Sequence, residues 1–501
     1  MSTATYVELR LPAVGPRGWH LDLAAALCRM GHLGVGVAWC DHEPVPERDL
    51  ERLLAIERRL HRLPSAGAAR AGRERLAHLS TGRPESGRVL VLDLTAGPAG
   101  HAGHAGQDEG WSLTFDGRRG EGAAAAALVA GRFPVVEVVD ASGTAVASAR
   151  PGSEWPGVTA AALDDVLAGC VSLLVAAVAG RPPRLLEEPA VDRRPTGGRS
   201  LTHQAARAVA RVPLRRAARI FYRTPHWRVG WRFVDGPGVV DTLQHPASGW
   251  QDLPDDGHHF YADPFPLKVA GRTYLFVEDY DHRVGKGVIS VVEFDDQGPM
   301  GTPVCVLEHE VHLSYPCVLE QDGEVWMIPE TSAAGTVELY RATDFPRSWV
   351  LDTVLLRDVD ANDVTPFRHG GRWWLSATVR GGGSCSDALH LWYADDLRGP
   401  WTPHRANPVV LDIASARPAG RVLERDGRLV RPAQDGTGGY GSALTLAEVV
   451  RLDADAFEQR TIGRLTAGED WRGSRLHTLN RAGRLEVIDG SSRSPRLRWP
   501  G

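Results

Sequence analysis

Apolar runs of two kinds alternate along residues 1–185. Short β-type runs such as "TYVELRL" (5–11) are separated by Ala- and Leu-rich stretches such as "GWHLDLAAALCRMGH" (18–32), and the long apolar stretch "TAAALDDVLAGCVSLLVAAVAG" (159–180) closes the segment. Strands that alternate with helices are typical of a parallel sheet, so the pattern predicts an α/β, Rossmann-like N-terminal domain. The turn after the first predicted strand, "LPAVGPRG", lacks the GxGxxG spacing, which leaves a dinucleotide site unsupported.

From residue 226 onward the pattern changes to short β-type runs punctuated by Gly, Asp and Pro, and it repeats. Each repeat contains a small or polar residue, in most copies a proline, then a strand, a Gly-containing hairpin turn and a second strand. The copies are "ADPFPLKVAGRTYLFVE" (262–278), "SYPCVLEQDGEVWMIPE" (314–330), "VTPFRHGGRWWLSATV" (364–379), "ARPAGRVLERDGRLVRPAQD" (416–435) and "SRLHTLNRAGRLEVIDG" (474–490).

The copies begin about fifty residues apart, which is the length of one four-stranded propeller blade. The sequence therefore predicts an all-β, five-bladed β-propeller as the C-terminal domain over residues 226–491. The segment "HWRVGWRFVDG" (226–236) is expected to supply a strand that closes the ring.

A basic segment joins the two predicted domains. Residues 193–232 contain eleven Arg and no Asp or Glu. The predicted organisation is an N-terminal domain at 1–185, an Arg-rich linker or helix at 186–225, the propeller at 226–491 and a tail at 492–501. Four arginines of the joint recur at i+4 spacing, which would place them on one helical face: Arg207, Arg211, Arg215 and Arg219. Such a face suits a solvated linker helix, or else an anionic membrane surface or phosphorylated substrate.

The repeat aligns five polar positions at the blade starts, where the innermost strands of a propeller surround its tunnel. These aligned positions are Asp263, Tyr315, Thr365, Arg417 and Arg475. At the end of the second strand the aligned residues are Glu278, Glu330, Val379, Asp435 and Gly490. The scaffold repeats while these positions vary, as expected if each blade donates a different side chain to a site.

Three acids from successive blades form a set suited to glycosidic bond chemistry. One carboxylate acts as base or nucleophile, a protonated carboxyl acts as general acid, and a third raises the pKa of the acid by like-charge proximity. We predict these catalytic residues to be Asp263, Glu330 and Asp363. The alternative reading of each is structural: Asp263 as a turn residue before proline, Glu330 as a strand-end ion-pair partner, and Asp363 as an Asx-turn.

Further polar residues near the same blade ends are expected to bind the substrate, and the arginines among them suit phosphate or carboxylate. The predicted substrate-binding residues are His259, Glu278, His312, Tyr315, Arg417, Arg431, Gln434, Asp435, Tyr440 and His477.

Composition narrows the classes of function. The net charge of −5 argues against a general nucleic-acid binder. The six cysteines have no CxxC spacing, and "HAGH" (101–104) lies in a Gly/Ala-rich stretch, so neither a metal nor another cofactor is predicted. No signal peptide is recognisable, and "VLAGCVSLLVAAVAG" (166–180) is too short for a membrane span, so a cytoplasmic protein is expected.

The motifs from "HHFYADPFPL" through "YLFVEDY", "HLSYPCVLE", "WMIPETS", "RPAQD" and "LHTLN" resemble the N-terminal propeller module of glucosamine inositolphosphorylceramide transferases, over about residues 226–490. That module is similar to the five-bladed propellers of glycoside hydrolase family 43. The resemblance implies that Asp263 is the base, Glu330 the acid and Asp363 the modulator. In that hydrolase family the modulator precedes the acid along the chain, whereas Glu330 precedes Asp363 here.

The N-terminal half is similar to the methionyl-tRNA formyltransferase type of domain that precedes such propellers in some bacterial proteins. The similarity is carried by "WSLTFDGRRGEGAAAAALVAGRFPVVEVVDASG" (111–143). The catalytic Asn, His and Asp of that family are not recognisable here, which implies a degenerate, non-catalytic formyltransferase-like domain.

The sequence leaves three hypotheses of function. The first is a carbohydrate-active enzyme that cleaves or transfers a glycosyl group in glycolipid or secondary-metabolite biosynthesis, with a glycoside or sugar phosphate as substrate. The second is a non-hydrolytic sugar or sugar-phosphate binding module with the N-terminal domain as scaffold. The third and weaker one is formyl or acyl transfer by the N-terminal domain.

Overall fold

The computed structural model describes residues 6–13, 15–40, 48–64, 67–79, 87–97, 109–186, 222–246, 248–468, 471 and 475–495. The chain divides into two units. The first comprises Met1–Pro213 with Gly381–Ala388 and Val410–Asp412, and the second comprises Leu214–Arg380, Leu389–Val409 and Ile413–Gly501. The predicted arginine face of the joint (Arg207, Arg211, Arg215 and Arg219) and the "HAGH" stretch lie outside the described residues, so the predictions about them stay untested.

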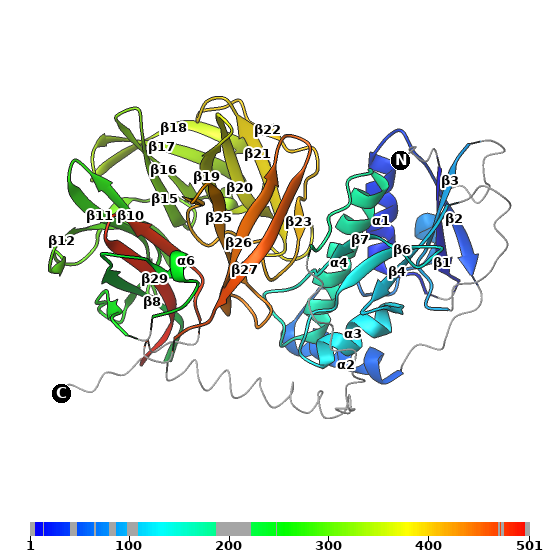
Figure 1. Ribbon diagram of the computed structural model, residues 1–501. Helices are drawn as coiled ribbons and strands as arrows, with labels where there is room; N and C mark the ends of the chain where they lie inside the picture. Colours follow the sequence, from blue (N-terminus) through cyan, green and yellow to red (C-terminus); the bar gives the residue numbers. More distant parts are fainter. Residues whose placement is uncertain are drawn as a thin grey trace. The chain divides into compact units, whose positions relative to one another are not determined.

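The first unit is built on a seven-stranded sheet in the order β2-β1-β3-β4-β6-β7, with β5 paired to β4 (Figure 1). Its strands are β1 (Tyr6–Pro12), β2 (Gly34–Cys40), β3 (Val89–Asp93), β4 (Glu109–Phe115), β5 (Arg118–Arg119), β6 (Val136–Asp140) and β7 (Ala145–Ala149). The pairs among β2, β1, β3 and β4 are parallel, whereas β5, β6 and β7 pair antiparallel. The near-continuous burial of β1 is typical of a central parallel strand.

The described helices of the first unit gather around one central helix. They are α1 (Gly18–Arg29), α2 (Arg48–His61), α3 (Glu121–Val129) and α4 (Thr159–Val178), and a 3₁₀ turn covers Arg73–Leu76. Helices α1, α2 and α3 each pack against α4. By length and composition alone α4 is apolar enough to cross a membrane, but its side chains, Leu163, Val166 and Leu173 among them, are buried in the unit as in a core helix.

The prediction of a parallel, Rossmann-like sheet is therefore wrong for the second half of this sheet. A doubly wound sheet is mostly parallel, whereas β5, β6 and β7 of this sheet all pair antiparallel. The sequence pattern misled because β6 and β7, at Val136–Asp140 and Ala145–Ala149, are joined by a short turn that permits only antiparallel pairing.

The second unit consists of five sheets arranged as the blades of a propeller (Figure 1). Blade one contains β10 (His259–Val269), β11 (Arg272–Asp281), β12 (Lys286–Asp295), β13 (Gly298–Pro299) and β14 (Val304–Leu307). Blade two contains β15 (Ser314–Gln321), β16 (Glu324–Glu330), β17 (Thr336–Asp344) and β18 (Ser348–Arg357), with a 3₁₀ turn at Ser332–Ala334. Blade three contains β19 (Ala361–His369), β20 (Arg372–Val379), β21 (Ala388–Ala394) and β22 (Thr402–Pro403). The short strand β23 (Val410–Leu411) falls in the segment Val410–Asp412 of the first unit.

Blades four and five complete the ring. Blade four contains β24 (Leu423–Arg425), β25 (Arg428–Asp435), β26 (Ala443–Leu452) and β27 (Phe457–Leu465). Blade five combines β28 (Leu479–Ala482) and β29 (Leu485–Pro495) with β8 (Tyr222–Phe233) and β9 (Gln251–Asp252), and the short helix α6 (Val239–Thr242) follows β8. Because β8 pairs antiparallel with β29, a strand from before blade one closes blade five, as the sequence predicted.

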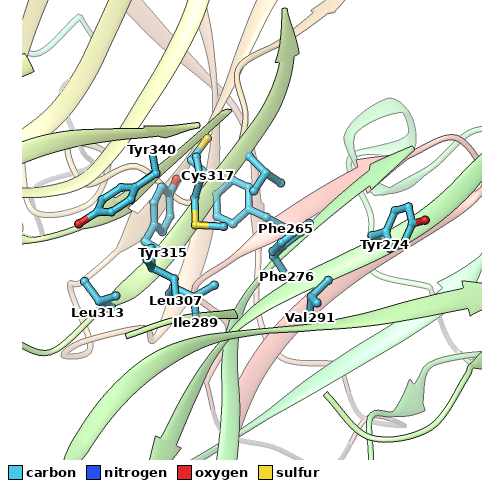
Figure 2. Packing of buried hydrophobic residues seen from close by; sticks show 12 residues of the cluster. Phe265, Tyr274, Phe276, Ile289, Val291, Leu307, Leu313, Tyr315, Cys317 and Tyr340 are labelled. Atoms are coloured by element: carbon cyan, nitrogen blue, oxygen red, sulfur yellow. The ribbon is translucent and has the colours of Figure 1, made fainter. Parts of the chain in front are cut away.

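Apolar clusters between blades hold the ring together. Figure 2 shows the cluster in which Phe265 and Phe276 of blade one meet Tyr315 and Cys317 of blade two. Comparable clusters join blade two to blade three, blade four to blade five and blade five to blade one. Because each blade buries its apolar face only against a neighbour, the inner strands are fixed relative to one another, and so are the polar groups at their ends.

Candidate functional site

Three of the inner strands begin with the same irregularity. The pairing of β10 with β11 shifts between Ala262 and Phe265, that of β15 with β16 shifts between Ser314 and Cys317, and that of β19 with β20 between Asn362 and Thr365. The bulged residues Asp263, Tyr315 and Asp363 have positive φ angles of 47°, 44° and 56°. Non-glycine residues seldom adopt this conformation, and bulges of this kind re-aim side chains next to sites.

The bulges correct the alignment that the sequence predicted. Asp363, not Thr365, occupies the position of Asp263 and Tyr315 in its blade. At the end of the second strand Thr378, not Val379, faces the residue before the bulge, as Glu278 and Glu330 do in their blades. The two predicted acids Asp263 and Asp363 are therefore equivalent positions of two blades.

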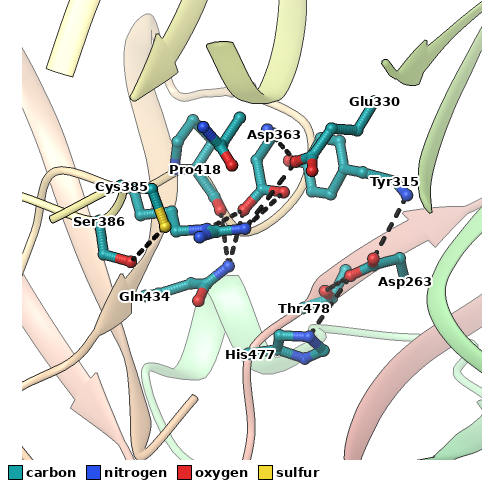
Figure 3. Close-up of polar contacts among 12 residues, drawn as sticks. Asp263, Tyr315, Glu330, Asp363, Cys385, Ser386, Pro418, Gln434, His477 and Thr478 are labelled. Carbon is teal, nitrogen blue, oxygen red and sulfur yellow. Dashed lines mark hydrogen bonds and ion pairs between the residues drawn. The ribbon is translucent and has the colours of Figure 1, made fainter. Parts of the chain in front are cut away.

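A carboxylate from the preceding blade accepts the backbone N–H of each bulged residue. The N–H of Asp263 donates to Asp489 Oδ2 at 2.9 Å and the N–H of Tyr315 donates to Asp263 Oδ2 at 3.3 Å. The N–H of Asp363 donates to Glu330 Oε2 at 2.9 Å, and Figure 3 shows the last two of these contacts. Each of the three bulges thus places its backbone N–H against an acid of the preceding blade.

Asp263 lies in a buried network with His477, Thr478 and Asp489. The Thr478 hydroxyl donates to Asp263 Oδ1 at 3.0 Å, and His477 Nε2 lies 3.6 Å from the same oxygen. His477 Nδ1 lies 2.6 Å from Asp489 Oδ1, which also accepts the Thr478 N–H at 2.8 Å. Burial raises the pKa of Asp263 to about 6, although the nearby His477 opposes the shift. Burial disfavours the charged form of His477, but Asp489 outweighs it, with Asp263 contributing, and raises the pKa of the imidazole.

Asp363 lies in a second network, with Arg417 and Gln434 of blade four (Figure 3). Arg417 donates from Nε to Asp363 Oδ2 at 2.6 Å and from Nη2 to Oδ1 at 3.3 Å, and Gln434 Nε2 donates to Oδ2 at 2.8 Å. Burial raises the pKa of Asp363 to about 7 despite Arg417, and the charge of Glu330 adds to the increase.

Glu278 is a third buried acid whose ionisation is disfavoured. Burial raises its pKa well above the usual value, and the negative charges of Asp263, Glu330, Asp489 and Asp363 raise it further. Its Oε1 lies 3.3 Å from His312 Nε2. Since these five carboxyl groups interact electrostatically, we call them together the carboxylate cluster: Asp263, Glu278, Glu330, Asp363 and Asp489.

Aromatic rings border the carboxylate cluster on one side. Trp227 of β8 stacks on the His477 ring, with centroids 4.1 Å apart, and Tyr440 packs edge-on against both rings. The Arg417 guanidinium lies 5.1 Å from the centroid of Tyr440. Tyr440 is partly exposed, whereas Trp227 and His477 are buried.

The structure brings many of the predicted site residues together. The three predicted catalytic residues, Asp263, Glu330 and Asp363, are members of the carboxylate cluster. Six predicted binding residues belong to the cluster or interact with it: Glu278, His312, Arg417, Gln434, Tyr440 and His477.

Four other predicted binding residues have structural partners instead. Arg431 donates to the backbone oxygens of Ser415 and Ala416 and to Gln459, and Asp435 pairs with Arg464 and Thr437. His259 contacts Asp279 through Nδ1, and the Tyr315 hydroxyl contacts Thr365 and accepts the N–H of Gly420. These contacts favour a structural role for each of the four. In Arg431 the guanidinium is fully buried among backbone acceptors, an outcome that residue type alone does not reveal.

The sequence prediction missed Thr478, Asp489 and Trp227. Asp489 lies in the predicted fifth repeat, one residue before the aligned Gly490, and the motif "VIDG" was its only signal. Asp263, His477 and Asp489 also present oxygen and nitrogen atoms within 4.8 Å of one another, as metal ligands do. Each ring nitrogen of His477 already faces one of the two carboxylates, so the group is satisfied by its own contacts and we assign no metal to it.

A family model described as "Glucosamine inositolphosphorylceramide transferase 1, N-terminal" matches residues 252–490. The glucosamine inositolphosphorylceramide transferase 1 of Oryza sativa subsp. japonica is 34% identical over 248 residues, which cover 46% of this chain and 33% of the relative. Its counterpart in Arabidopsis thaliana is 33% identical over 230 residues, covering 44% and 30%. The chain thus spans about a third of the length of the curated relatives that it matches.

The resemblance of the propeller to this family is therefore supported, whereas the proposed formyltransferase-like domain is not. The family match begins at residue 252 and so does not reach the first unit, and the relatives named above are plant proteins, which lends no support to a bacterial context.

Among solved structures, an exo-beta-1,3-galactanase from Clostridium thermocellum is similar over 48% of this chain and 60% of its own, with a TM-score of 0.34 and 12% identity. Zg3597, a family 117 glycoside hydrolase of Zobellia galactanivorans, is similar over 54% of this chain and 91% of its own, with a TM-score of 0.33 and 15% identity.

Proposed function

We propose that the propeller binds a glycosyl group at the carboxylate cluster and carries out acid–base chemistry on it, cleaving or transferring the group. The observation that carries the proposal is the pair of buried carboxyls Asp263 and Asp363, with pKa values of about 6 and about 7. General acid–base catalysis is most efficient when the pKa of the group lies near the working pH, and two such carboxyls on one face are typical of glycoside chemistry.

The contacts suggest how the roles are divided. Asp263 is held by Thr478, His477 and the Tyr315 N–H, all of which stabilise its ionised form and suit a base. Glu278 is suited to carry a proton at neutral pH, because burial and four neighbouring acids raise its pKa well above the usual value. Glu330 accepts the Asp363 N–H and lies 3.8 Å from Arg417, so in this arrangement it acts as an acceptor.

One observation favours a second candidate function, a site that binds a sugar without cleaving it. Arg417 makes two hydrogen bonds to Asp363 and also approaches Glu330. Carboxylates committed to an arginine are less available for proton transfer, and such pairs also serve to position hydroxyl groups of a ligand.

The substrate class proposed here draws on the names of the relatives, which contain glucosamine and inositolphosphorylceramide. A glycan headgroup of a lipid, or a soluble sugar phosphate with the same chemistry, is the glycosyl substrate that we propose. Because the match covers only the N-terminal part of the family, the transferase activity of the whole relatives is likewise only a proposal for this chain.

The test is a screen of aryl glycosides and sugar phosphates with the wild type and with Asp263→Asn. We expect Asp263→Asn to lower turnover by about 100- to 10,000-fold, and wild-type activity to rise with pH through about 6 as Asp263 loses its proton. Asp395→Asn is the matched control, because its side chain on blade three is 96% exposed.

The outcomes separate the two candidates. Equal turnover by the wild type and Asp263→Asn would exclude Asp263 as the base. Binding of a sugar without turnover in the wild type, with weaker binding by Asp263→Asn, would favour the binding function and reject the catalytic one.

A further inference from the structure

The ring of His312 is held in place by the backbone of a neighbouring strand. Its Nδ1 accepts the N–H of Gly287, on β12, at 2.9 Å, and the N–H of Leu313 donates to the oxygen of the same glycine at 3.1 Å. A Cβ on Gly287 would lie 2.7 Å from Cε1 of the ring, so a larger residue at this position would displace the imidazole. The orientation of His312 is therefore set by β12 and not by the carboxylate cluster.

This orientation also decides where the proton of the neutral imidazole lies. A ring nitrogen that accepts an N–H carries no hydrogen of its own, so the proton of neutral His312 is on Nε2. Burial lowers the pKa of the imidazole below its usual value, which keeps the ring neutral at about pH 7. Nε2 lies 3.3 Å from Glu278 Oε1, so it is a neutral N–H donor that faces this carboxyl.

The carboxyl of Glu278 has no comparable partner elsewhere. Apart from His312, no residue that the structure describes makes a hydrogen bond or an ion pair with it, although its side chain is buried. The ring of Tyr280, two residues further along β11 and so on the same side of the strand, lies 6.0 Å from the His312 ring. The other ionisable groups that act on Glu278 are all acids and oppose its ionisation: Asp263, Glu330, Asp489 and Asp363.

We propose that His312 is a positioning residue for Glu278, whose Oε1 it holds through Nε2–H so that the proton of the protonated carboxyl lies on Oε2. This inference rests on the proposed function, in which Glu278 carries the proton. A neutral donor suits the task because it serves Oε1 in both protonation states of the carboxyl. Hydrogen bonds of catalytic groups are often long in the absence of substrate and shorten when it binds, which agrees with the distance of 3.3 Å.

Two substitutions separate the roles of the two ring nitrogens. The amide oxygen of His312→Asn takes the place of Nδ1 and accepts the Gly287 N–H, but this side chain is too short to reach Glu278. The longer amide of His312→Gln donates to Glu278 from the position of Nε2. We expect His312→Asn to lower turnover by about 10- to 100-fold with little change in KM, and His312→Gln to recover most of the loss. The substrate is the aryl glycoside that the wild type turns over fastest in the screen above.

The pH profile tests the same contact in a way that a merely structural role of His312 would not affect. A hydrogen bond from Nε2–H favours the ionised form of Glu278, so its loss raises the pKa of the carboxyl. Turnover that needs protonated Glu278 falls as the pH rises through this pKa. We therefore expect the alkaline fall of turnover in His312→Asn to move up by about one pH unit.

His309→Asn is the matched control, because His309 lies in the same loop and is held in a similar way. Its Nδ1 accepts the N–H of Val311 at 3.2 Å, and its Nε2 lies 4.0 Å from Oε2 of Glu338, an acid outside the carboxylate cluster. The turnover and pH profile of His309→Asn should equal those of the wild type. An equal loss in both Asn variants would contradict a specific role of His312.

Nitrogen NMR of the histidine side chains in the full chain supplies a readout that is independent of turnover, with His312→Asn identifying the signal. We expect a neutral His312 ring with its proton on Nε2 at about pH 7. A cationic ring, or a proton on Nδ1, would overturn the proposal. Wild-type turnover in His312→Asn would also overturn it while leaving the proposed function standing. If the wild type turned over none of the glycosides, the proposed function would fail, and the role of His312 with it.

Discussion

At the residue scale, the buried acids of the site lower the free energy of unfolding when they are ionised. Burial raises the pKa of Asp263, of Asp363 and of Glu278. A group whose pKa is higher in the folded than in the unfolded state favours folding below its unfolded pKa, and this contribution is lost as the pH rises through the folded pKa. The free energy of unfolding should therefore fall between about pH 4 and pH 7.

Glu278→Gln should remove part of this cost. We expect the variant to exceed the wild type in free energy of unfolding at pH 8 by more than about 1 kcal/mol, and the two to converge below pH 4, where the wild-type carboxyl is protonated in both states. Denaturant unfolding over this pH range measures the difference. Glu293→Gln, on the neighbouring β12 and away from the cluster, should follow the wild type. A Glu278→Gln variant no more stable than the wild type at pH 8 would show that the acids do not destabilise one another.

At the element scale, the hairpins were predictable and their register was not. The alternation of apolar residues and the Gly-containing turns predicted each first and second strand. The bulges at Asp263, Tyr315 and Asp363 insert residues whose positive φ has no sequence signature, and this shifted the predicted alignment of the third blade by two residues. A bulge depends on what its N–H meets in the preceding blade, which a single repeat cannot reveal.

Tyr315 uses its bulge to join three blades rather than to bind a ligand. Its hydroxyl contacts Thr365 of blade three at 2.9 Å and accepts the Gly420 N–H, just before blade four, at 2.7 Å. We expect Tyr315→Phe to lower the free energy of unfolding by about 1–3 kcal/mol, because it leaves a buried N–H without its acceptor.

Thermal or denaturant unfolding tests this prediction. Tyr274→Phe is the control, since Tyr274 belongs to the same apolar cluster and its hydroxyl makes no hydrogen bond within the described residues. Equal stability of the two variants would mean that the Tyr315 hydroxyl does not join the blades.

At the scale of the whole second unit, ring closure depends on β8. Trp231 of β8 packs against Phe294 of blade one and lies in a cluster with Leu485 and Val487 of blade five. The chain therefore closes its propeller with a strand that precedes the first repeat.

Trp231→Ala should lower the free energy of unfolding by about 3–5 kcal/mol, because it opens a cavity where blades five and one meet. The measurement is a denaturant transition followed by circular dichroism. Trp155→Ala in the first unit, at a side chain that is 59% exposed, should change stability by no more than about 0.5 kcal/mol. If Trp231→Ala unfolded at the same denaturant concentration as the wild type, β8 would be dispensable for closure of the ring.

The sequence by itself determined the five blades and the closing strand, because strand periodicity and turn residues are local properties that recur in each repeat. It also singled out Asp263, Glu330 and Asp363 as candidate residues. Only the tertiary structure decided which polar groups meet. Asp263 is joined to Asp489 across 226 residues and Asp363 to Arg417 across 54. Arg417 and Arg431 lie in the same repeat and are both buried, yet one meets a carboxylate and the other backbone oxygens. Such choices depend on geometry around the ring, since a guanidinium accepts either partner and the packing of the blades selects one.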